Sequence, residues 1–170
     1  VTVKEKLEKN QKTFKRKIRK LKFTLGSSIY RRMFFKENKM TKEFIVIIDN
    51  LLTMSNQQEK LILSAKNIRS NSPTLRKINQ NQNTVDRELN QITKQLINLS
   101  NQTFFVSPKI NRAIGKLKNS ISKTILFFEQ KKISSARKYQ LDILKNINEI
   151  TFLLLLSMEE MQNSNSVSGF

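Results

Sequence analysis

The chain of 170 residues contains no cysteine and no histidine. Without cysteine there are no disulfide bonds, thiolate metal sites or thiol nucleophiles. Without histidine the chain lacks the commonest general acid–base catalyst and a principal ligand of zinc and haem. We therefore expect no catalytic residues, no metal site, no cofactor and no small-molecule substrate.

Glycine and proline are scarce, with three and two residues respectively. Both prolines follow a serine, at Ser72–Pro73 and Ser107–Pro108. A serine hydroxyl caps a helix N-terminus, and proline is tolerated at the first helical position because its missing N–H would have no partner there. Each pair predicts the start of a helix, and the low glycine and proline content favours long helices over a turn-rich β fold.

Acidic residues are few, at 13 against 32 basic residues, which gives a formal net charge of +19. Such a balance predicts attraction to nucleic acid, to anionic lipid or to an acidic protein. The chain is also rich in lysine, asparagine and isoleucine, the residues that an A/T-rich genome supplies, so part of the charge is attributable to codon usage.

Long apolar runs are absent. The longest, Phe152–Leu156, is far shorter than the roughly 20 residues that a bilayer span requires, and no signal peptide is expected. The run is apolar on nearly every side of a helix, so it is either surrounded by several helices or left for a partner. The candidate partner surface consists of Phe152, Leu153, Leu155 and Leu156.

What the sequence does contain is helical periodicity. Between residues 72 and 99 the inward positions recur at alternating steps of three and four, at Leu75, Ile78, Gln82, Val85, Leu89, Ile92, Leu96 and Leu99. This is the seam of a helix packed lengthwise against other helices, and similar stripes occur near 42–69, 110–128 and 135–161. We predict an all-α, antiparallel bundle of about five helices with coiled-coil-like seams. The polar seam residues Gln58 and Gln82 are expected to form register-setting hydrogen bonds.

Three domains follow from this pattern: a basic amphipathic helical segment at 1–40, a bundle core at 41–162 and a flexible tail at 163–170. We expect residues 104–106 to plug one end of the bundle, and Gly115 to mark a close approach of two helices. The inner seam of the third predicted helix is expected to pack against apolar residues of the last two helices, namely Ile114, Leu117, Ile121, Ile147, Ile150 and Leu154.

Residues 1–40 hold 14 basic and 3 acidic residues. Their polar face could bind an anionic membrane surface or nucleic-acid phosphates, could bind a protein partner, or could simply be the solvated outer face of a bundle helix. The candidate polyanion contacts are Lys12, Lys15, Arg16, Lys17, Arg19, Lys20, Lys22, Arg31 and Arg32.

Several short patterns together resemble a known family. They are Asp49–Leu52 with Ser55 and Gln57–Glu59, the run 100–108 with Ala113–Gly115, Ala136 with Gln140, Leu144 and Asn148, and Ser157–Met158 with Met161–Gln162. Over roughly residues 45 to 170 the chain resembles the late coiled-coil region of long, membrane-anchored bacterial proteins of unknown function, common in the Bacteroidota.

The resemblance implies a structural or interaction role, with a protein partner or self-association, in the soluble part of a membrane-anchored protein of the bacterial cell envelope. The cytoplasm is the alternative location. The family carries no catalytic residues over to this chain. The chain departs from the family in its short length and its basic first 40 residues, and we expect no membrane anchor within it.

Overall fold

The structure is a computed structural model that describes residues 39–167. All nine candidate polyanion contacts, and the helix predicted to carry them, lie outside the described residues.

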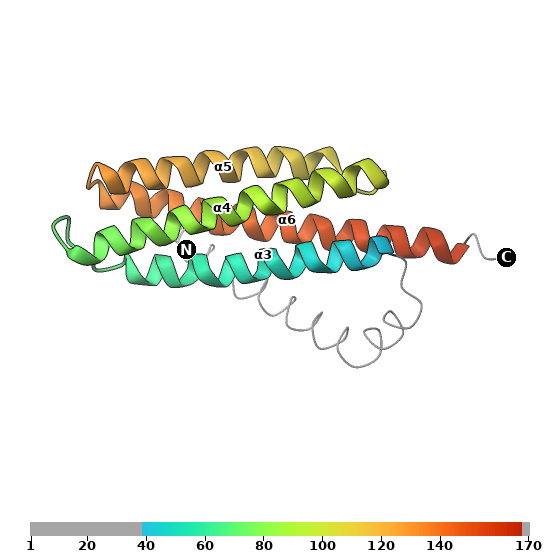
Figure 1. Cartoon of the computed structure of the whole chain (residues 1–170), viewed down its shortest axis with the longest axis horizontal. Coiled ribbons are helices and arrows are strands. Elements are labelled where there is room, and N and C mark those ends of the chain that lie inside the picture. Colours follow the sequence, from blue (N-terminus) through green and yellow to red (C-terminus); the bar gives the residue numbers. More distant parts are fainter. Residues whose placement is uncertain (1–38, 168–170) are drawn as a thin grey trace, which may run out of the picture. The chain divides into compact units, whose positions relative to one another are not determined.

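Residues 39–167 form four helices and no strand: α3 (Lys39–Ser64), α4 (Pro73–Gln102), α5 (Pro108–Glu129) and α6 (Ile133–Val167). The helices lie lengthwise beside one another, and the connections alternate between the two ends, so successive helices run antiparallel (Figure 1). The all-α prediction is confirmed for this part of the chain. The predicted count of five stays a prediction, because the first expected helix is outside it.

Both Ser–Pro pairs start helices as predicted. The Ser72 hydroxyl accepts a hydrogen bond from the Thr74 backbone N–H at 3.3 Å, and the Ser107 hydroxyl accepts one from the Lys109 N–H at 3.2 Å. Each serine has extended backbone angles, as an N-cap residue must. Local chemistry thus sets the first residues of α4 and α5.

The hydrophobic core runs along the inner faces of all four helices. Every residue of the predicted inner seam is buried, namely Leu75, Ile78, Val85, Leu89, Ile92, Leu96, Leu99, Ile114, Leu117, Ile121, Ile147, Ile150 and Leu154. α5 packs closely against α4 and most extensively against α6. Small buried residues on the inner faces, such as Ala113 and Ser120 on α5 and Ala136 on α6, let these helices approach.

The α5–α6 connection is a tight C-terminal cap. The Lys132 N–H donates to the Phe127 carbonyl at 2.8 Å, and the Lys131 N–H donates to the Phe128 carbonyl at 3.0 Å. This is the Schellman arrangement, and it places Lys131 in the left-handed region with φ 57°. A non-glycine residue in this conformation costs roughly 1 kcal/mol, which the short antiparallel connection offsets.

Two local expectations are wrong. Phe104 is fully exposed and Phe105 is half-buried, so of residues 104–106 only Val106 joins the core. Gly115 lies on an exposed face of α5, and a Cβ added there would have no heavy atom within 4 Å apart from its chain neighbours and the backbone of its own helix. The close helix–helix approach expected at this glycine does not occur, because the inner face of α5 passes through its neighbours Ala113 and Ile114 instead.

The helix ends also differ from the sequence prediction. α3 begins at Lys39 rather than Lys42 and ends at Ser64 rather than Arg69. The chain then turns at Ala65, whose side chain is fully buried. α6 continues to Val167, past residue 163, where we expected a flexible tail. Polar residues such as Asn163 and Ser164 therefore occupy helix, because helical hydrogen bonding propagates from the packed turns before them.

Candidate interaction surface

Three glutamines from three helices meet in the core. Gln58 on α3, Gln82 on α4 and Gln140 on α6 are each 0% exposed. The Gln82 amide donates to Gln58 Oε1 at 3.0 Å, and Gln58 donates back to Gln82 Oε1 at 3.4 Å. Gln140 also donates to Gln82 Oε1, and Gln58 donates to the Gln140 backbone carbonyl, both at 3.4 Å. We call these three residues the glutamine layer.

Gln58 and Gln82 form buried hydrogen bonds, as expected, and the structure shows that they bond to each other. Sequence reasoning missed the third member of the layer. Gln140 stood on the apolar stripe of the last predicted helix, and a polar residue in such a stripe was the available signal. Its Oε1 atom is buried without a hydrogen-bond partner. The layer is therefore held by four hydrogen bonds and leaves one acceptor unsatisfied, which is costly inside a core.

A polar ladder joins the outer edges of α3 and α4. Its donors and acceptors repeat every seven residues on both helices, and the three bonds are Gln102 to Glu43 at 3.1 Å, Asn50 to Gln95 at 3.5 Å and Gln57 to Glu88 at 3.3 Å. On the other side of α3, the Ser55 hydroxyl donates to Asn148 Oδ1 of α6 at 3.0 Å. α3 is thus tied by side chains to both α4 and α6.

The candidate partner surface on α6 is only partly open. Phe152 is 45% exposed and Leu156 is 39% exposed, whereas Leu153 and Leu155 are half-buried. Leu141, 40% exposed, lies on the same side of α6, eleven residues before Phe152 and so close to three helical turns away. The structure therefore brings Phe152 and Leu156 to the surface with Leu141, which sequence reasoning had not singled out.

Charge is unevenly distributed over the four helices. α3 and α6 together hold seven acidic and six basic residues, whereas α4 and α5 hold three acidic and nine basic residues. On α4, the exposed residues Arg76, Arg87 and Lys94 are separated by eleven and seven residues, so helical geometry places them on one side. The α4–α5 part of the surface is thus basic, and the α3–α6 part is nearly neutral.

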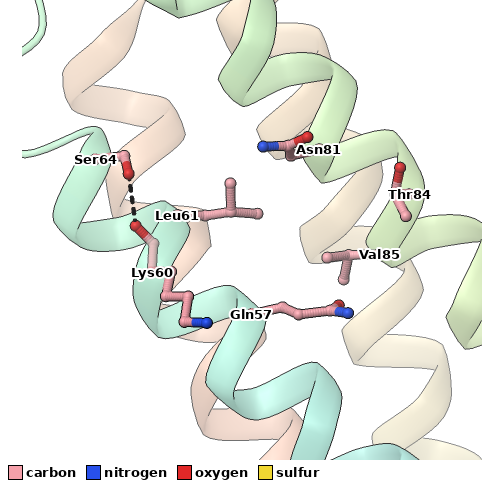
Figure 2. Close-up of a pocket in the computed structure, with 7 residues that line it drawn as sticks. All are labelled: Gln57, Lys60, Leu61, Ser64, Asn81, Thr84 and Val85. Carbon is pink, nitrogen blue, oxygen red and sulfur yellow. Dashed lines mark hydrogen bonds between the residues drawn. The ribbon is translucent and has the colours of Figure 1, made fainter.

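A shallow hollow of about 290 Å³ lies between α3 and α4. Leu61 and Val85 point toward one another across it, and Gln57 and Asn81 reach toward the opposite helix (Figure 2). Lys60 is the one ionisable residue of its lining, and the Ser64 hydroxyl donates to the Lys60 carbonyl at 2.8 Å. The hollow thus pairs no acid with a base and offers no activated nucleophile.

Within residues 39–167, no three Asp or Glu side chains gather in a way that could hold a metal ion. None of the four described helices combines the length and the hydropathy that a bilayer span requires. Comparison with known protein families, curated proteins and solved structures finds no match to this chain. The resemblance to the long envelope proteins therefore stays a prediction from the residues alone.

Proposed function

We propose that the chain is a non-catalytic helical scaffold or protein-interaction segment, part of an envelope-associated bacterial protein. The observation that carries this proposal is the exposure of Phe152 and Leu156 on a helix whose opposite face is fully buried. Large apolar side chains at neighbouring helical positions are a frequent mark of a protein–protein contact. The envelope location rests on the family resemblance.

The packing of the helices supports a scaffold. Hydrogen bonds that repeat every seven residues between α3 and α4 accord with coiled-coil-like seams, in which flanking polar side chains set the alignment of the helices. The buried glutamine layer would favour one register over its neighbours in the same way. A long, aligned bundle presents its outer faces at set positions, and presenting a surface is what a scaffold requires.

The interaction proposal is tested by photo-crosslinking. A photoreactive benzoylphenylalanine in place of Phe152 should form covalent adducts with a protein in cells, because this ring lies in the proposed contact. The same residue in place of Ile97, a similarly exposed position on α4, is the matched control. Mass spectrometry of the adducts identifies the partner, whether another protein or a second copy.

Adducts at position 152 that exceed those at position 97 support the interaction proposal. Equal yields at the two positions would contradict it. Fractionation of the same cells tests the location: the chain should accompany the envelope fraction, and recovery in the cytoplasmic fraction alone would contradict that part of the proposal.

The second candidate function is binding to a polyanion, through the basic residues of 1–40, on anionic membrane or nucleic acid. The uneven charge of the bundle supports this alternative. α4 and α5 together carry a surplus of six positive charges, which would also attract a polyanion. Each basic residue near an anionic membrane contributes about 1 kcal/mol to binding, and this contribution falls as salt screens it.

Co-sedimentation with vesicles tests this alternative. Reversal of Lys15, Arg16, Arg19 and Lys20 to Glu should lower binding to phosphatidylglycerol vesicles at least a hundredfold in low salt, because four attractive charges become repulsive. A second variant reverses Arg76, Arg87 and Lys94 on α4, and tests whether the basic side of the bundle contributes to binding. Duplex DNA serves as competitor, and its affinity should fall with salt at a slope near −0.9 per phosphate neutralised. Binding that neither set of reversals weakens would contradict the alternative.

A further inference from the structure

The outer face of α6 carries one stripe of mixed apolar and charged residues. Leu141, Lys145, Phe152, Leu156 and Glu159 follow one another at separations of four, seven, four and three residues. All five are exposed, and these separations place them on one side of the helix. The stripe has the spacing of a second helix-packing seam, opposite the one that faces the core.

Charge along α6 is polarised. Residues 133–147 hold three basic residues and one acidic residue, whereas residues 148–164 hold three acidic residues and no basic residue. Lys145 and Glu159 stand seven residues before and seven residues after Phe152. Any helix with this polarity is complementary to a copy of itself that runs in the opposite direction.

We propose that a second copy of this chain covers this stripe, with the two α6 helices antiparallel and Phe152 at the two-fold axis. The inference rests on the proposed interaction function and names its partner. About this axis, Lys145 of each chain lies opposite Glu159 of the partner subunit, so the two-fold symmetry gives two such ion pairs. Phe152 packs against its own copy, and Leu156 packs beside it. The contact is isologous and closes on itself, as dimer contacts in most homo-oligomers do.

The opposite orientation is disfavoured by the same charges. In a parallel pair, Lys145 would face Lys145 and Glu159 would face Glu159 of the partner subunit, and like charges across a helix contact repel. An unrelated partner would need its own charge pattern to match, whereas a second copy supplies the match by symmetry. Charge complementarity therefore points to self-association as the occupant.

The direction of pairing is tested with a spin label. The chain has no native cysteine, so Lys138→Cys, at an exposed position three residues before Leu141, gives a single labelling site in the full chain. Lys138 is fourteen residues from Phe152, so the two backbones at this site are roughly 42 Å apart in the antiparallel pair. In a parallel pair they would be about 10 Å apart. Pulsed electron–electron double resonance distinguishes these two distances.

The contacts are tested by sedimentation equilibrium of the purified full chain over a range of concentrations. Phe152→Glu should raise the dimer dissociation constant at least a hundredfold, since it buries a charge at the axis. Ile97→Glu, a matched change on α4, should leave it unchanged. Lys145→Glu or Glu159→Lys alone should each raise it about tenfold, and the double exchange should restore it, because the symmetric pairs are re-formed with opposite signs.

Three results would overturn the proposal: a chain that stays monomeric, a short distance at position 138, or a double exchange that binds no better than its single variants. Circular dichroism shows whether each variant is folded, and the exchange of exposed charges keeps the test valid if Phe152→Glu unfolds. A monomeric chain whose position 152 still crosslinks another protein refutes self-association and leaves the interaction function standing. A dimer whose contact maps elsewhere, with no adduct at position 152, refutes both.

Discussion

Leu96→Ala is expected to lower the free energy of unfolding by about 2–5 kcal/mol. Leu96 is 1% exposed and is the second-to-last residue of the α4 seam. Replacement by alanine removes its apolar contacts and leaves a cavity that α3, α5 and α6 cannot fully fill, because close-packed helices relax only in part. Urea denaturation followed by circular dichroism measures the change, with an unaltered denaturant dependence showing that the unfolded state is the same.

The neighbouring residue provides the control. Ile97 follows Leu96 directly, has a side chain of the same composition and is 52% exposed. Ile97→Ala should therefore change the unfolding free energy by no more than about 0.5 kcal/mol, since alanine also has the better helix propensity. If the two variants lost comparable amounts of unfolding free energy, the buried face of α4 would differ from the one that the structure shows.

Gln82→Met is expected to lower the free energy of unfolding by about 2–5 kcal/mol, although methionine has a similar size and shape. Gln82 binds both other members of the glutamine layer, so its loss leaves Gln58 Oε1 and the Gln140 amide without these partners in the core. Each buried polar group without a partner costs about 1–3 kcal/mol. Chemical denaturation measures the loss, and the matched variant is Gln91→Met, at an exposed position of the same helix.

The triple replacement separates stability from alignment. With methionine at Gln58, Gln82 and Gln140 together, no side-chain amide of the layer is left without a partner, so stability should return to the wild-type value or exceed it. If the layer selects the register of the helices, the triple variant should also lose amide-exchange protection and show several conformations by NMR. If the triple variant is as unstable as Gln82→Met, buried polar groups without partners do not explain the loss of stability. If it is stable and has a single conformation, the glutamine layer does not select the register.

The α3–α4 ladder shows where periodicity reaches its limit as a predictor. Heptad spacing placed Gln58 and Gln82 on inward faces, and the position of each residue on its helix follows from its number alone. Which helix lies beside which, and at what level, depends on contacts between segments far apart in the chain. Gln140 enters the layer 58 residues after Gln82, and no local pattern gives that distance.

By itself the sequence determined the helical class, the starts of α4 and α5 and the inward faces, because capping, proline geometry and a 3.6-residue period act within a few residues. Tertiary structure alone decided the exposure of Phe104, the open surroundings of Gly115 and the membership of Gln140 in the glutamine layer. It also decided that Phe152 and Leu156 reach the surface while Leu153 and Leu155 are half-buried. In a run that is apolar on every side of a helix, the sequence pattern does not show which side faces the core. The packing of the neighbouring helices determines which residues stay exposed to a partner.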